Sequence, residues 1–161
     1  MGVDADTGQI LAVELTSSDV DDGSQVEALL DQITGLLASF TGDGAYDQAG
    51  IHGTVAVRNP DADVIVPPRS TAMLSEDVET TPTRRDRHLK SIAEHGCRGW
   101  QKTSGYTRRA LVEAAVSRFK RVIGDALRSR TGRHCVTEVA IAVDALNRML
   151  ELGRPKCVRI A

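Results

Sequence analysis

Hydrophobic positions recur at two different spacings along the chain, which predicts an alternation of short strands and helices. The segment DADTG, residues 4–8, is typical of a tight turn, and the apolar residues 10–15 follow it, so the N-terminus is predicted to form a β-hairpin. Residues 21–39 carry apolar side chains at helical spacing and predict a helix ending near Ser39. Its predicted buried face consists of Val26, Leu29, Leu30, Ile33, Leu36 and Leu37.

The next part of the chain predicts a strand, a helix and a second strand. Residues 40–42 form a very short predicted strand that leads to Asp43, and residues 49–59 predict a helix that Pro60 closes. Residues 63–66 predict another strand. Residues 70–83 are polar and lack periodicity, so we expect a flexible surface loop there.

The second half of the chain predicts mainly helices. Residues 84–94 predict a basic helix, residues 96–105 a loop with the only tryptophan, and residues 106–128 a long helix. A last helix over residues 137–152 should end at Gly153 and Pro155. Its predicted inward residues are Val139, Ala140, Val143, Leu146 and Leu150. Strands that alternate with helices predict one α/β domain with long C-terminal helices.

The composition excludes several classes of protein. A length of 161 residues with 41% hydrophobic content suits one globular domain. The acidic N-terminus does not resemble a secretory signal, and no apolar run approaches the roughly 18 residues of a membrane span. We therefore expect a cytoplasmic protein without a membrane partner. The three cysteines and four histidines lack the spacing of a zinc site or a disulfide framework.

The charges are distributed unequally between the two halves. Residues 1–83 contain 15 acidic residues and only two arginines, whereas residues 84–161 contain 7 acidic residues and 18 lysines or arginines. The net charges are therefore −13 and +11. This asymmetry predicts a surface for a polyanion, with DNA the commonest candidate. The alternative is an internal interface between the acidic and the basic halves.

Four polar residues of the long predicted helix fall on one stripe. Tyr106, Arg109, Glu113 and Lys120 lie within about 60° of arc at ~100° per residue. The predicted inner face on the opposite side consists of Leu111, Val112, Ala115, Phe119, Val122 and Ala126. A carboxylate between cations suits a site where a divalent ion and phosphate are held together. The alternative is a solvated helix face with an ordinary ion pair between Arg109 and Glu113.

The spacing of these four residues resembles the signature of DDE transposases of bacterial insertion sequences, whose catalytic domain is ribonuclease-H-like. The closest resemblance is to the insertion sequence five group. The stretch GDGAYD, residues 42–47, is similar to the segment that carries the second catalytic aspartate of that family. VDADTGQILAVELT, WQKTSGYTRRALVE and ALNRMLELGRPKCVRIA resemble other parts of it, so the resemblance extends over residues 2–161.

The resemblance implies an enzyme that cleaves and joins DNA strands with two Mg²⁺ ions. Asp43 would then be the second aspartate and Glu113 the glutamate, both catalytic and both metal ligands. Tyr106, Arg109 and Lys120 would position DNA phosphate near the metal site. The implied partners are transposon ends and target DNA, and transposases of this type act as homo-oligomers on paired ends.

The first aspartate of the family lies on a strand upstream of the hairpin that residues 2–15 resemble, and would fall before Met1. We therefore expect an N-terminally truncated ribonuclease-H-like domain over residues 1–161, without the first strand and most of the second. Asp4 and Asp6 occupy turn positions in the predicted hairpin, which argues against a role as metal ligands. The alternative function is a catalytically inactive transposase remnant that binds DNA through its basic half.

Other residues of the basic half are candidates for DNA contacts. Lys102 and Arg108 are expected to contact phosphate, as are the cations around residues 84–98. Trp100 could stack on a DNA base or anchor its own loop, and its neighbours leave both interpretations open.

Overall fold

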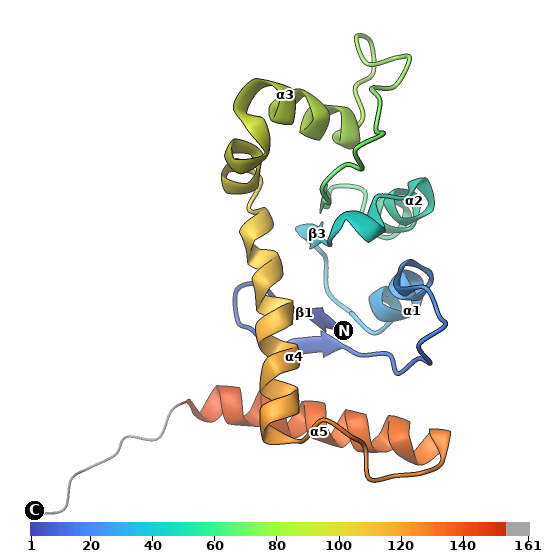
Figure 1. Ribbon diagram of the computed structural model, residues 1–161, viewed down its shortest axis with the longest axis vertical. Coiled ribbons are helices and arrows are strands. Elements are labelled where there is room, and N and C mark those ends of the chain that lie inside the picture. The colour runs from blue at the N-terminus through green and yellow to red at the C-terminus, as the bar shows by residue number, and fades with distance from the viewer. Residues whose placement is uncertain (154–161) are drawn as a thin grey trace, which may run out of the picture. The chain divides into compact units, whose positions relative to one another are not determined.

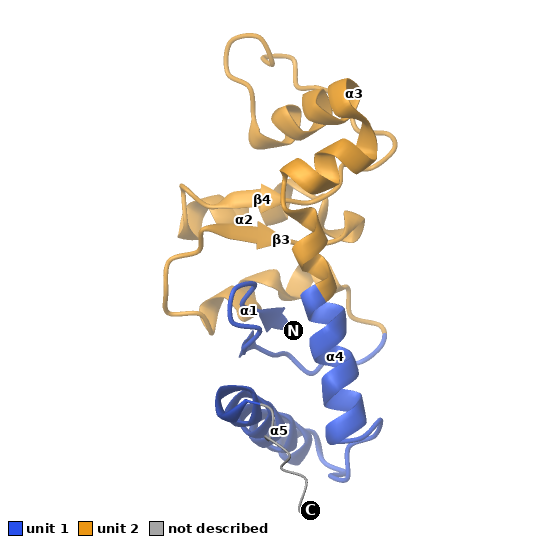
Figure 2. Cartoon of the chain, turned by 90° about the vertical axis from the view of Figure 1, so that its left-hand side faces the viewer, with its two compact units in different colours: residues 1–18, 111–161 blue, residues 19–110 orange. Residues whose placement is uncertain are grey.

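The computed structural model describes residues 1–153, whose helices and strands are shown in Figure 1. The chain divides into two compact units, coloured separately in Figure 2: unit 1 comprises residues 1–18 and 111–161, and unit 2 comprises residues 19–110. Both units contain helices and a small sheet, which confirms the mixed α/β class. Pro155 and Cys157, part of the predicted C-terminal stop and of the cysteine set, lie outside the described residues.

Unit 2 is built around a strand–helix–strand segment. β3 (Ser39–Thr41) pairs in parallel with β4 (Asp63–Ile65), Phe40 lies opposite Val64, and α2 (Ala49–Arg58) connects the strands. All three elements confirm the expectation from the apolar pattern and from Pro60. The helix and the sheet share one apolar core with the preceding helix, consisting of Val26, Leu30, Ile51, Val55, Ala62, Val64 and Val66.

The predicted helix over residues 21–39 is wrong in its length. A 3-10 helix, η1 (Asp22–Gln25), leads into α1 (Val26–Asp31), and the chain then leaves the helical conformation. Thr34 and Gly35 are poor helix formers, which explains the early end. Leu36, predicted to face inward, is 95% exposed because it lies beyond the helix.

The predicted loop over residues 96–105 is also wrong, because α3 (Arg84–Thr103) continues through most of it. Gly96 has φ of 70° and ψ of 167°, so it bends the chain between two helical pieces. A residue without a Cβ adopts this conformation readily, and the second piece resumes directly after it. Residues 70–83 contain no helix or strand, as expected.

Unit 1 begins with the predicted hairpin, β1 (Gly2–Val3) paired antiparallel with β2 (Ile10–Ala12). Asp4 Oδ1 accepts hydrogen bonds from the amides of Asp6 and Thr7, so this acid stabilises the turn, as its position in the sequence predicts. In the described residues the hairpin and the β3–β4 pair form separate two-stranded sheets.

The long helix predicted for residues 106–128 is shorter and irregular at its start. A 3-10 helix, η3 (Tyr106–Arg109), precedes α4 (Ala110–Val122), and Gly124 then adopts a positive φ of 128°. Ala126, expected on the inner face of this helix, lies beyond its end and is exposed. Within α4 the predicted inner face is confirmed for Ala115, which is buried, and for Phe119, which packs against the unit 1 core. It is wrong for Leu111 and Val122, which are exposed at the two ends of the helix.

The last helix, α5 (Gly132–Leu152), begins five residues before the predicted start, with Thr131 as its N-cap. Val139, Val143 and Leu146 are buried as predicted, whereas Ala140 and Leu150 are exposed. Gly153, with φ of 71°, ends the helix as expected. No helix in residues 1–153 combines the length and the apolar character that crossing a membrane requires.

Candidate functional site

Asp43 lies two residues beyond the end of β3, where it begins a short 3-10 helix, η2 (Gly44–Tyr46). Its Oδ1 accepts a hydrogen bond from the Ala45 amide at 2.9 Å, so the carboxylate caps this turn. Gly42 suits the position before it, because a Cβ there would lie 2.9 Å from the Tyr46 ring. The turn therefore presents a half-buried carboxylate at the carboxyl end of a parallel strand pair.

Two further acids share the surroundings of Asp43. Burial raises the pKa of Tyr46 above its usual value, and the negative charges of Asp22, Asp43 and Asp21 raise it further. Carboxylate oxygens are the ligands that Mg²⁺ prefers, so the donor type at Asp43 fits the expected metal. Residues 1–153 nevertheless contain no group of three or more His, Cys, Asp or Glu side chains placed to hold a metal ion.

Tyr106 also belongs to unit 2, and its turn lies next to β3, the strand that leads to Asp43. η3 contacts both β3 and α3, and Gly105 enters η3 with a positive φ of 76°. The Tyr106 ring lies against the Trp100 ring, with 5.2 Å between their centroids. Two of the sequence-predicted site residues, Asp43 and Tyr106, therefore come from neighbouring elements of one unit.

The other half of the predicted signature lies in α4. Glu113 and Lys120 are exposed and belong to unit 1, whereas Arg109 ends η3 in unit 2. Glu113 and Lys120 lie on α4 away from the buried Ala115, which agrees with the polar stripe expected from the helical spacing. Asp43 and Glu113 thus belong to different units of the chain.

Trp100 is buried, with only 2% of its surface exposed to solvent, so its neighbours are other residues of the protein. Its Nε1 donates to His88 Nδ1 at 2.9 Å, and His88 Nε2 lies 2.9 Å from the Val64 carbonyl oxygen. Since Nδ1 accepts, Nε2 carries the proton and donates to the carbonyl. This chain of bonds ties α3 to β4, which favours the anchoring interpretation of Trp100. Lys102 and Arg108 are exposed on α3 and η3.

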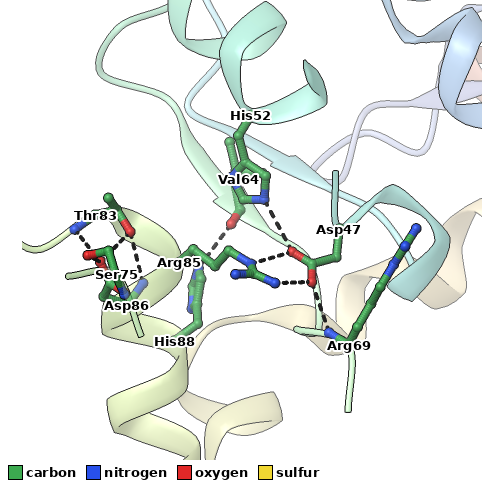
Figure 3. Close-up of polar contacts among 9 residues, drawn as sticks. All are labelled: Asp47, His52, Val64, Arg69, Ser75, Thr83, Arg85, Asp86 and His88. Carbon is green, nitrogen blue, oxygen red and sulfur yellow. Dashed lines mark hydrogen bonds and ion pairs between the residues drawn. The ribbon is translucent and has the colours of Figure 1, made fainter. Parts of the chain in front are cut away.

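Asp47, four residues after Asp43, forms a polar centre that the sequence patterns did not reveal (Figure 3). Its side chain is 2% exposed and accepts hydrogen bonds from Arg85 Nε and Nη2, each at 2.8 Å, and from the Arg69 amide at 2.9 Å. The Arg85 guanidinium and, secondarily, the Arg69 amide hold the pKa of Asp47 below its usual value, although burial opposes them. Asp47 belongs to GDGAYD, but its partner Arg85 lies 38 residues away along the chain.

The first turn of α3, which supplies Arg85, is itself held by a buried acid. Asp86 accepts from the amide and hydroxyl of Thr83, and from the amide and hydroxyl of Ser75 (Figure 3). These hydrogen bonds, led by the Thr83 hydroxyl, hold the pKa of Asp86 far below its usual range. The Thr83–Asp86 capping box therefore fixes the start of α3 and anchors the preceding loop.

Comparison with known protein families identifies the lineage of this arrangement. The model of the transposase DDE domain family matches residues 1–148. The chain belongs to this family. The match assigns it to the proteins of DNA transposition and recombination, whose members are nucleases or polynucleotidyl transferases and typically use a divalent metal. It agrees with the resemblance carried by GDGAYD and by the Tyr106 to Lys120 spacing. No solved structure matches the chain.

Proposed function

We propose that this chain is an insertion-sequence transposase of the insertion sequence five group that cleaves and joins DNA strands. The family match over residues 1–148 carries the proposal. The position of Asp43 supports it, because ligands of parallel α/β sheets bind at the carboxyl ends of the strands. The parallel β3–α2–β4 segment is consistent with a ribonuclease-H-like catalytic domain.

In this proposal Asp43 and Glu113 supply carboxylates for Mg²⁺, and the reaction acts on a DNA phosphodiester. Bound Mg²⁺ would lower the pKa of an attacking water or 3′-hydroxyl and stabilise charge on the leaving oxygen. Arg109 and Lys120 hold the phosphate in place, since guanidinium and ammonium groups form charge-assisted hydrogen bonds with its oxygens. The neutral hydroxyl of Tyr106 donates one further hydrogen bond to it. Lys102 and Arg108 add contacts to the DNA backbone, and two or more copies act on paired transposon ends.

The experiment is a nicking and strand-transfer assay on supercoiled plasmid that carries the flanking ends of the element, with Mg²⁺ or with EDTA. We expect Mg²⁺-dependent cleavage that Asp43→Asn and Glu113→Gln each reduce at least about 100-fold, because even the partners of metal ligands affect activity about 10- to 100-fold. Asp61→Asn and Glu27→Gln are the matched controls, since both acids are exposed. Equal activity of Asp43→Asn and Asp61→Asn would exclude Asp43 from the site.

The same samples test the inactive alternative. A chain that retains labelled DNA but cleaves none in Mg²⁺ or Mn²⁺ acts as a DNA-binding remnant, and the catalytic proposal is then wrong. Retention should weaken steeply with salt, because lysine and arginine contacts to phosphate release counterions.

A further inference from the structure

A pocket of about 560 Å³ lies in unit 2, and its lining includes Asp47, which ends the η2 turn that Asp43 begins, but not Asp43 itself. α2 contributes His52 and Ala56, β4 contributes Val64, and the first turn of α3 contributes Arg84 and Arg85. Pro60, Ala49, Thr83 and Asp47 complete its lining. The pocket thus combines apolar walls with basic groups from two helices, and its volume suits a small organic molecule.

The basic groups of this pocket are held in place by the protein. Asp47 binds two donors of the Arg85 guanidinium, which fixes its plane and leaves it further N–H groups, since arginine carries five. Arg84 Nη2 donates to the Pro60 carbonyl oxygen at 2.5 Å, which likewise uses only part of the donors of its guanidinium group. Asp47 balances one of the two arginine charges, so the lining is net positive. A preorganised pair of guanidinium groups is suited to phosphate recognition.

His52 adds a ring nitrogen that has no hydrogen bond within the described residues, although Asp47 lies within ion-pair distance of it (Figure 3). Its Nε2 is buried and forms no hydrogen bond, and it lies 3.7 Å from Asp47 Oδ1, beyond hydrogen-bond range. Burial lowers the pKa of His52, and the Arg85 charge lowers it further against the opposing effect of Asp47. A buried polar atom without a partner is costly, and a ligand oxygen could satisfy it.

We propose that this pocket binds one nucleotide unit of DNA through its phosphate, as a contact separate from the metal site. Arg84 and Arg85 hold the phosphate oxygens, His52 Nε2 forms one hydrogen bond, and the walls at Ala56, Pro60 and Val64 contact the sugar or base. This inference rests on the proposed function in one respect, namely that the polymer bound is DNA. Free nucleotides carry the same chemistry, and the experiment distinguishes the two sources.

The test is the fluorescence anisotropy of a fluorescein-labelled single-stranded oligonucleotide, measured in EDTA at one salt concentration. EDTA separates the result from catalysis, so an inactive enzyme can still confirm the pocket. We expect Arg84→Ala to weaken binding about tenfold, the loss typical of one hydrogen bond to a charged group. Arg133→Ala removes the same charge from an exposed position of α5 outside the pocket lining and should change the affinity no more than about twofold.

His52→Ala should weaken binding about three- to tenfold, the range for one neutral hydrogen bond, whereas His95→Ala, at an exposed position, should leave it unchanged. Thermal midpoints and circular dichroism establish that each variant is folded. Arg84→Gln keeps the long side chain and replaces Arg84→Ala if the alanine variant does not fold.

Competition experiments identify the ligand. Thymidine 5′-monophosphate should displace the oligonucleotide from the wild type better than inorganic phosphate does, and thymidine should not displace it. Equal losses in Arg84→Ala and Arg133→Ala would overturn the pocket, because they indicate general electrostatic attraction. Displacement by inorganic phosphate as effective as by the nucleotide would overturn the role of the apolar walls. Nucleotide binding that depends on Arg84, without an effect on the oligonucleotide, would overturn DNA as the source.

Discussion

Replacing Asp47 by asparagine tests whether a buried ion pair holds the segment after Asp43 to α3. The substitution keeps the size and shape of the side chain and removes its charge. In the wild type the carboxylate accepts three hydrogen bonds, two from the Arg85 guanidinium and one from the Arg69 amide. Asparagine retains one acceptor oxygen and turns an NH₂ group toward a donor, so at least one bond to Arg85 is lost.

The expected cost follows from burial and exposure of the two partners. Breaking a fully buried pair costs about 3–5 kcal/mol, and a hydrogen bond to a charged group contributes about 1.5–3 kcal/mol. Asp47 is 2% exposed but Arg85 is 35% exposed, so water can solvate part of the guanidinium when its partner is removed. We therefore expect the free energy of unfolding to fall by about 2–3 kcal/mol, discounted for the exposure of Arg85.

A second aspartate–arginine pair of unit 2 provides the control. Asp31 and Arg58 lie 2.7 Å apart, but their side chains are 67% and 32% exposed. Exposed pairs contribute about 0–1 kcal/mol, so Asp31→Asn should have a small effect. Urea unfolding followed by the emission of Trp100, the only tryptophan, measures both variants in unit 2. Equal losses of stability in the two variants would refute the reasoning, because burial would then make no difference.

The effect of Asp47→Asn should also depend on pH. The folded pKa of Asp47 is lowered relative to an unfolded value of about 3.9, so its charge stabilises the protein above that value. This contribution is lost as the pH falls through the folded pKa. The stability difference between wild type and Asp47→Asn should therefore be full at pH 7 and shrink below about pH 4. A difference that stays constant down to acid unfolding would indicate that the carboxylate does not ionise differently on folding.

Two further substitutions test the capping of α3 and the edge of the hairpin. Asp86→Asn should lower the thermal midpoint at neutral pH, because the hydrogen bonds from Thr83 and Ser75 lower the pKa of the wild-type carboxyl and stabilise its charged form. This difference in thermal midpoint should disappear as acid protonates the wild-type carboxyl. A difference that persists unchanged in acid would contradict this. Asn147 exchanges two hydrogen bonds with the backbone of Ile10, at 2.9 and 2.8 Å. Asn147→Ala should destabilise unit 1 by about 1–3 kcal/mol, since it leaves partly buried backbone groups of Ile10 unpaired. Hydrogen exchange of the Ile10 amide should become faster. An unchanged exchange rate would show that water replaces the side chain.

Local patterns predicted the ends of helices well where the sequence contains a residue that stops a helix, such as proline or glycine. Pro60 and Gly153 gave the correct ends of α2 and α5, because missing donors and positive φ angles act within a few residues. The turn at Asp4 was predicted for the same reason. Predictions failed where tertiary packing decided the outcome: α3 continues beyond Gly96 because Trp100 packs into unit 2 and bonds to His88.

The candidate site shows the same division. The order of residues alone indicated Asp43 and the polar stripe of Glu113 and Lys120, because a motif and a helical period are local properties. The roles of Asp43 and Glu113 in metal binding stay predictions that the plasmid assay tests. The sequence did not decide whether Trp100 stacks on DNA or packs inside the protein, and its 2% exposure became evident only from the fold.

The sequence by itself determined the family, the α/β class and the short strand that leads to Asp43, since these follow from spacing along the chain. Only the tertiary structure decided which charges are buried and which are paired. In the sequence Asp47 is an ordinary acidic residue of a turn, and only the fold brings Arg85, 38 residues away, into hydrogen-bond contact with it. Burial and pairing depend on contacts between distant segments, and the same contacts create the pocket beside His52 and Arg84.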